Sequence, residues 1–177
     1  MTVNDRDIRE VAIYTGLSLM SKGYSVSPLK LQKLLYYEQA WFMVMGGRCN
    51  TLFPDVPQAW VNGPVYPTIY HTYKGKTANM CDHLKLSDFT DRRVDEAMEE
   101  YHHRIALPDE YVELIESVIN LYGAKTQNQL IFMTHSERPW AETRGDLPPF
   151  ERSEREIPLD VMCDYYTERH RRNMSKR

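Results

Sequence analysis

The sequence predicts a mainly α-helical fold: a compact single-domain bundle of about six to seven helices with a small element of short β-strands. Three observations predict it. Apolar residues recur at helical spacing along most of the chain, and glycines and prolines separate these stretches. A length of 177 residues fits one domain. The hydrophobic content of 42 % is ordinary for a globular protein, so the fold needs no metal or disulfide scaffold.

The first two helices are predicted before residue 48. The first begins near Asp5, and Gly23 ends its pattern. Its buried stripe consists of Ile8, Val11, Ala12, Thr15 and Leu19. The second opens at Ser27-Pro28, where Ser27 caps the N-terminus and Pro28 suits the first turn, and Gly46-Gly47 ends it.

One face of the second helix is apolar. This face consists of Leu31, Leu34, Leu35, Trp41, Phe42 and Met45. Glu38 falls on the same stripe, which leaves two interpretations. It lies at the edge of the stripe or pairs with a lysine, or else it is a partly buried carboxylate that orders a neighbouring segment or meets a partner. Lys30, Gln32 and Lys33 flank the stripe and are expected to lie in solvent.

The middle of the chain is less regular. Residues 48–62 contain one candidate strand, Gln58 to Val61, followed by the turn signal Asn62-Gly63. Pro64 is expected to open a helix that runs to Tyr73. Residues 74–89 show no period and are expected to form a loop.

Four further helices are predicted in the second half, and a loop holds Pro139-Trp140 and Pro148-Pro149. They cover residues 91–104, 109–122, 126–133 and a final segment from Ile157 to Tyr166. Thr126 and Gln129 form a capping-box pattern. We expect the domain to span residues 1–167 and residues 168–177 to be a basic, disordered tail. The tail holds Arg169, Arg171, Arg172, Lys176 and Arg177.

Composition excludes several classes of protein. The polar start from Met1 to Asp5 carries no targeting pattern, and no apolar run is long enough to span a membrane. The net charge of −3 disfavours nucleic-acid binding as the main role. Cys49, Cys81 and Cys163 are odd in number and far apart, which argues against disulfides and is typical of a reducing cytoplasm.

No pattern indicates catalysis, a cofactor or a metal. The chain has no phosphate-binding glycine loop and no nucleophile elbow. Cys81 with His83, and Glu99 with His103, supply too few ligands for a metal site. His135 has no visible nucleophile beside it, so we interpret it as a structural hydrogen-bonding residue. We therefore expect no enzyme and no catalytic residue.

Two segments nevertheless resemble a known family. They are KLQKLLYYEQAWFMVMGG, residues 30–47, and AWVNGPVYPTIYHTYK, residues 59–74; a weaker third match is the His-Ser-Glu-Arg-Pro-Trp run at 135–140. Together they resemble the Panacea domain of SocA-like, or phage-associated GepA, proteins, over roughly residues 8–166. The chain departs from the family pattern at Glu38, where a small residue is usual.

The resemblance implies an antitoxin encoded beside a toxin. SocA-type members deliver their toxin to the ClpXP protease, with ClpX as a second partner, whereas others neutralise toxins by direct binding. Two alternatives stay open. One is a DNA-binding regulator, supported only by the basic tail and lacking a helix-turn-helix pattern. The other is a phage-associated helical interaction module without a toxin. The sequence leaves the oligomeric state open.

The motifs also nominate residues. Gly63, Pro64 and Pro67 would make a rigid helix start around which rigid aromatic side chains are placed. Trp60 and Tyr70 are either interface anchors or core residues. For Tyr66 the hypothesis to test is that it is an exposed interface anchor. The expected partner-binding residues are Lys30, Lys33, Tyr37, Glu38, Asn62, Gly63, Pro64, Tyr66, Pro67 and Tyr70. The expected structural residues of the motifs are Leu31, Leu34, Leu35, Trp41, Trp60, Pro139 and Trp140.

Overall fold

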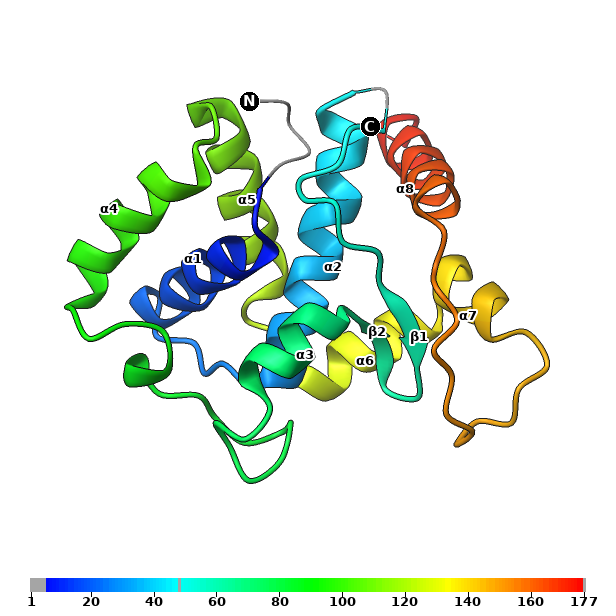
Figure 1. The fold of residues 1–177 in the computed structure, drawn as a ribbon. Helices are drawn as coiled ribbons and strands as arrows, with labels where there is room; N and C mark the ends of the chain where they lie inside the picture. The colour runs from blue at the N-terminus through cyan, green and yellow to red at the C-terminus, as the bar shows by residue number, and fades with distance from the viewer. Residues whose placement is uncertain (1–5, 48, 177) are drawn as a thin grey trace.

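A computed structural model describes residues 6–47 and 49–176. The predicted mainly α fold is confirmed, with eight α-helices and one small two-stranded sheet in these ranges (Figure 1). The elements in chain order are α1 (Ile8–Ser21), α2 (Pro28–Met45), β1 (Gln58–Trp60), β2 (Gly63–Val65), α3 (Pro67–Tyr73), a 3-10 helix (Leu86–Asp88), α4 (Val94–Ile105), α5 (Asp109–Tyr122), α6 (Gln127–His135), α7 (Arg138–Arg144) and α8 (Leu159–Met174). None of the described helices is both long and apolar enough to cross a bilayer.

The central element is α2, which packs against α1, α3, α5, α6, α8 and the hairpin (Figure 1). Ser27 caps its N-terminus as predicted, accepting a hydrogen bond from the Lys30 amide at 3.0 Å. Every residue from 28 to 40 is buried. The predicted apolar stripe is therefore too narrow a description, because neighbours surround this part of α2 and leave no solvent face.

The hairpin precedes α3 and corrects the predicted helix start at Pro64. β1 and β2 pair antiparallel, with Gln58 opposite Val65 and Trp60 opposite Gly63. Pro64 therefore lies in β2, and α3 begins at Pro67. Both prolines suit a helix start, but backbone pairing across the turn decides between them. The predicted strand at Gln58 is confirmed.

One helix was not predicted. Residues 138–144, expected to be loop, form α7, which packs on α6, α8 and β1. Pro139 lies in its first turn, where a proline needs no amide hydrogen. The prediction of one continuous loop, based on Pro139-Trp140 and Pro148-Pro149, was therefore wrong for these residues.

The predicted disordered tail is also wrong for residues 168–174, because α8 continues to Met174. Arg169 follows Tyr166 by three positions and so lies on the same helix face. Its guanidinium reaches the buried Glu137 carboxylate at 2.9 Å. Residues 1–5 and Arg177, at the two ends of the predicted domain and tail, lie outside the described residues.

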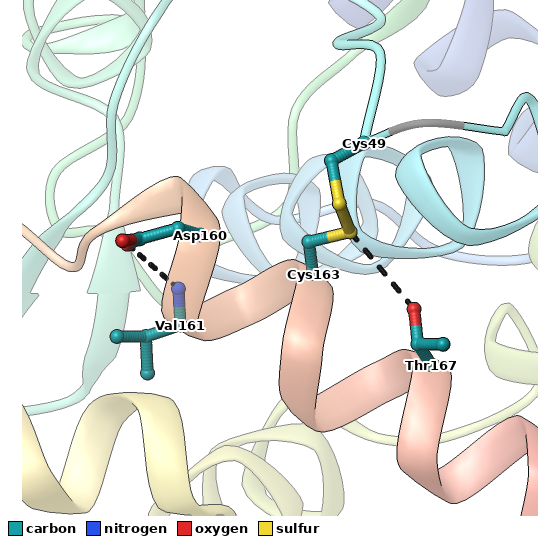
Figure 2. The surroundings of a disulfide bond; sticks show 5 residues. All are labelled: Cys49, Asp160, Val161, Cys163 and Thr167. Carbon is teal, nitrogen blue, oxygen red and sulfur yellow. Dashed lines mark hydrogen bonds between the residues drawn. A yellow bond between two sulfur atoms is a disulfide. The ribbon is translucent and has the colours of Figure 1, made fainter.

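The cysteines contradict the expectation that they stay unpaired. Cys49 and Cys163, 114 residues apart in sequence, form a disulfide with a Cα–Cα distance of 5.8 Å (Figure 2). The two meet because α8 packs back on α2, beside the segment that follows α2. Cys81 is a free, exposed cysteine.

Removal of residues 168–177 tests the role of α8. We expect the free energy of unfolding to fall by about 1–3 kcal/mol, because the buried Glu137 carboxylate loses its cationic partner, which is itself partly exposed. Urea unfolding measures this change. Removal of residues 175–177 alone is the control and should cost less than about 0.5 kcal/mol. Equal stability of the two truncated chains would contradict a structural role for residues 168–174.

Candidate binding site

A hollow of about 360 Å³ lies between the hairpin, α3 and the loop that leads to α8. We call its apolar and aromatic lining side chains the wall and its polar lining residues the rim. The wall consists of Leu29, Trp60, Val61, Val65, Tyr70 and Met80, and the rim of Asn62, Arg152, Ser153 and Glu154. Such a lining, mostly apolar with a few polar groups, is typical of a binding site.

Trp60 and Tyr70 dominate the wall. Their ring centroids lie 4.9 Å apart at an interplanar angle of 59°, and both side chains are partly exposed. The Lys74 ammonium lies 5.8 Å from the Tyr70 ring. Large aromatic side chains lose little conformational entropy on binding, and they are common anchors of protein interfaces.

Polar side chains of α2 hold the hairpin in place. The Gln32 side-chain amide donates to the Tyr66 carbonyl at 3.1 Å and accepts from the Tyr66 amide at 2.8 Å. The Lys33 ammonium donates to the Pro64 carbonyl at 2.8 Å. These buried groups satisfy backbone atoms that have no partner in so small a sheet. The hairpin is therefore fixed to α2 by side-chain hydrogen bonds.

Gln39 does the same for the chain before the hairpin. Its side chain accepts from the Leu52 amide at 2.7 Å and donates to the Phe53 carbonyl at 2.9 Å. Leu52 and Phe53 are completely buried, although they belong to neither a helix nor a strand. Gln39 thus allows an irregular segment to enter the core without unsatisfied backbone groups.

Gly63 lets the hairpin lie close to α2 and α6. Its φ is +95°, a conformation that residues with a side chain rarely adopt. A Cβ atom there would lie 2.7 Å from Thr134 Oγ1 and 2.8 Å from Lys33 Cε. Both the backbone angle and the contact therefore require glycine at this position.

The segment from His135 to Arg144 supports the hairpin from its other side. The Trp140 indole donates to the Trp60 carbonyl at 2.9 Å, and its ring stacks on His135 with centroids 3.8 Å apart. Arg144 donates to the Ala59 carbonyl at 3.3 Å. These hydrogen bonds consequently hold the backbone of β1 at Trp60 in place, and the ring of Trp60 lines the hollow.

Arg144 also organises the loop that carries the rim. Its guanidinium donates to the carbonyls of Pro148 and Glu151, each at 2.8 Å. Farther along, the Ala59 amide donates to the Arg155 carbonyl at 2.8 Å, so this loop runs beside β1 (Figure 1). One buried arginine thus fixes the rim relative to the wall.

A buried carboxylate begins α7. Tyr37, Tyr166 and Arg169 all donate to Glu137, with distances of 3.0 Å from Tyr37 and 2.9 Å from Arg169. Burial raises the pKa of Glu137 above its ordinary value, while these hydrogen bonds and the charge of Arg169 oppose the rise. The cluster joins α2, α7 and α8 behind the hollow.

A family model described as "Antitoxin SocA-like, Panacea domain" matches residues 31–141. The chain belongs to this family. Neither the curated proteins nor the solved structures include a significant match to it. The matched range holds most of the wall of the hollow and Asn62 of the rim, and it ends before the other three rim residues and α8.

The Panacea motif is mainly structural in this chain. Its residues Leu31, Leu34, Leu35 and Pro139 are buried, Trp41 and Trp140 are partly buried against the core, and Trp60 is partly exposed. The Trp41 indole donates to the Tyr122 hydroxyl at 2.9 Å and so ties α2 to α5. That these residues serve the fold and not partner binding stays a prediction.

Most of the expected partner-binding residues do not reach the surface. Lys30, Lys33, Tyr37, Glu38, Gly63, Pro64 and Tyr66 are buried, whereas Asn62, Pro67 and Tyr70 are at least partly exposed. The idea that Tyr66 is an exposed anchor is wrong, since its side chain lies at 0 % exposure against Phe53. Trp60, assigned to the structural set, has the partly exposed ring instead.

The two lysines were expected to lie in solvent, which is wrong because their stems enter the core. Lys30 donates to the Gly123 carbonyl at 2.6 Å, at the C-terminal end of α5, where a cation is favourable. Burial lowers the pKa of Lys30, and it lowers the pKa of Lys33 to about 7.

Glu38 matches the second of its two interpretations and is more deeply buried than that interpretation supposed. Its side chain is 1 % exposed, and the Thr15 hydroxyl lies 3.0 and 3.1 Å from its two oxygens. Burial raises the pKa of the Glu38 carboxyl well above its ordinary value, and the hydrogen bond from Thr15 opposes the rise. Glu38 therefore orders α1 against α2, and it is not a surface contact.

Sequence reasoning named Asn62 but missed the other three rim residues and the Glu137 cluster. Arg152, Ser153 and Glu154 belong to a stretch without period, so no local signal linked them to Trp60. The last predicted helix includes Tyr166, but the hydrogen-bond partner of Tyr166, Glu137, is 29 residues away in sequence. Among residues 6–47 and 49–176, no three His, Cys, Asp or Glu side chains gather as metal ligands.

Tyr66→Ala and Tyr70→Ala should separate core from surface. We expect Tyr66→Ala to lower the free energy of unfolding by about 3–5 kcal/mol, because it leaves a cavity beside Phe53. Tyr70→Ala removes a partly exposed ring and should cost roughly 1 kcal/mol or less. Chemical denaturation of both variants provides the comparison, and similar losses would contradict the assignment.

The stability of the domain should depend on pH through Lys33. The unfolded chain keeps this lysine protonated up to its ordinary pKa of 10.5, whereas the folded chain releases the proton near pH 7. Unfolding therefore takes up a proton between these values, and the free energy of unfolding rises with pH by up to about 1.4 kcal/mol per unit. Lys33→Met should flatten this rise between pH 7 and 10, measured by urea unfolding.

Lys76→Met, at an exposed position, is the matched control and should keep the full slope. Lys30 and the buried tyrosines titrate in every variant, so only the difference between Lys33→Met and the control matters. Parallel curves for the two variants would show that Lys33 is not the group responsible.

Proposed function

We propose that the chain is the antitoxin of a toxin–antitoxin pair and neutralises its toxin by direct binding. The observation that carries this proposal is the match of residues 31–141 to the SocA-like Panacea family. In this proposal the chain acts in the cytoplasm without catalysis, and its partner is a protein encoded nearby.

The hollow at Trp60 and Tyr70 is the proposed toxin-contacting face. Three features support it: the partly exposed aromatic pair, the backbone hydrogen bonds that hold the hairpin rigid, and a rim with both charges. A rigid site binds with a smaller loss of entropy than a mobile one. A volume of about 360 Å³ fits one bulky apolar side chain of the partner, while Arg152 and Glu154 orient polar neighbours.

Two routes of neutralisation follow from binding. The antitoxin can cover the active surface of the toxin, or it can deliver the toxin to the ClpXP protease with ClpX as a further partner. Both require the same toxin contact, and they differ in whether the toxin persists. We propose direct binding as the common step and delivery as the finer alternative.

Growth rescue tests the proposal and its contact face together. The gene is expressed with each neighbouring gene, and we expect one neighbour to be lethal alone and harmless with the antitoxin. Tyr70→Ala should weaken toxin binding roughly tenfold or more, as expected for an aromatic anchor, and should reduce rescue although the variant loses about 1 kcal/mol of stability or less. Phe132→Ala is the control, because Phe132 is 73 % exposed and does not line the hollow.

Rescue by the unchanged chain and by both variants alike would refute the contact face while leaving the antitoxin role. Absence of a lethal neighbour would refute the antitoxin role. The half-life of the rescued toxin in cells with and without active ClpXP then distinguishes the two routes. A half-life that the antitoxin does not change supports direct blocking, and a half-life shortened only with ClpXP supports delivery.

A further inference from the structure

The Cys49–Cys163 disulfide joins two parts of the molecule that meet only through tertiary packing. Cys49 lies in the exposed segment after α2, and Cys163 lies on α8 at 2 % exposure (Figure 2). Cys49 also has a φ of 54°, which is unfavourable for a residue with a side chain. The bond therefore fixes the exposed segment and α8 to each other.

A chain of contacts leads from this bond to the hollow. On α8, Tyr166 and Arg169 donate to Glu137, and Glu137 precedes the first residue of α7. From α7, the Trp140 indole donates to the backbone carbonyl of Trp60. The position of α8 thus affects the support of the aromatic wall through Glu137 and Trp140.

We propose that Cys49 and Cys163 form a redox-sensitive tether that controls how firmly α8 and α7 hold the hollow. In the oxidised form the tether fixes α8 on α2. In the reduced form α8 and α7 open more often, and the hollow loses part of its support. The consequence for toxin binding rests on the proposed function, whereas the tether itself does not.

The geometry favours reduction at Cys49. Since Cys49 is the exposed residue of the pair, a thiolate of a low-molecular-weight dithiol attacks its sulfur, the S–S bond breaks, and Cys163 leaves as a thiolate. Thr167 Oγ1, 3.9 Å from Cys163 Sγ, can donate to this thiolate before it takes up a proton (Figure 2). The second thiol of the reagent then attacks the mixed disulfide and frees Cys49. Two electrons and two protons pass from the dithiol to the cysteine pair, and the dithiol becomes a disulfide.

Oxidation runs the same steps in reverse, with a low-molecular-weight disulfide as the acceptor. Exposed Cys49 forms the mixed disulfide first, and the Cys163 thiolate displaces the small thiol. A reducing compartment keeps such a pair as thiols until an oxidant arrives. The tether therefore responds to the thiol–disulfide balance around the protein.

Hydrogen exchange of the purified full chain, with and without dithiothreitol, tests the proposal. We expect reduction to speed exchange in α8 and in α7, residues 159–174 and 138–144, far more than in α1 and α4. It should also lower Tm by roughly 5–15 °C, the range for loss of a long-loop disulfide in a domain of this size. Cys81→Ser should respond like the unchanged chain, because Cys81 is free.

Cys49→Ser should exchange like the reduced chain, and addition of dithiothreitol should not change its exchange. Because position 49 is exposed, the variant keeps the packing of Cys163. Faster exchange confined to the segment around Cys49 would overturn the coupling to α7. No effect of dithiothreitol on α8, with the disulfide confirmed as reduced by thiol titration, would overturn the tether. Neither result depends on growth rescue, so failure of the antitoxin proposal remains a separate outcome.

Discussion

The architecture depends on hydrogen bonds from buried side chains of α2 to the backbone of an irregular segment. Residues 52–66 contain only two short strands, yet much of this stretch is buried. Gln32, Lys33 and Gln39 supply the partners that a larger sheet would provide. An unsatisfied buried backbone group costs roughly 1–3 kcal/mol, so several together would prevent this packing. The hairpin, the hollow beside it and the start of α3 all follow from these contacts.

Periodicity predicted the helices well where one face is buried. The cap at Ser27 and the capping box at Thr126 were read correctly, because both are local patterns with a direct backbone partner. Periodicity failed where tertiary contacts, and not the local pattern, determine the secondary structure. Pro64 and Pro67 look equally suitable as helix starts, and only pairing with β1 excludes the first. The basic end of α8 looked like a solvated tail because the partner of Arg169 is Glu137, which lies far away in sequence at the N-terminus of α7.

Only part of the candidate site could be predicted from the sequence. The motif located Trp60 and Tyr70, and sequence reasoning left open whether each was core or surface. Burial was misjudged for the lysines, since a charged side chain among leucines is usually solvated. Neighbouring elements surround this part of α2 and exclude solvent from its lysines, and burial lowers the pKa of Lys33 to about 7. The other three rim residues could not be predicted, because residues 152–154 meet the hairpin only through the folded path of the loop that Arg144 fixes.

The end of the family match separates the aromatic pair of the hollow from its charged residues. The aromatic wall belongs to the matched residues 31–141, while the charged rim comes from the loop after them. The wall is mounted mainly on the hairpin and α3, which hydrogen bonds from α2 hold in place. The loop with residues 152–154 is held at either side of them, through the backbone carbonyls of Pro148, Glu151 and Arg155. Substitution of the two charged residues in this single loop would therefore change the charge at the hollow without altering the aromatic pair or the helices that carry it.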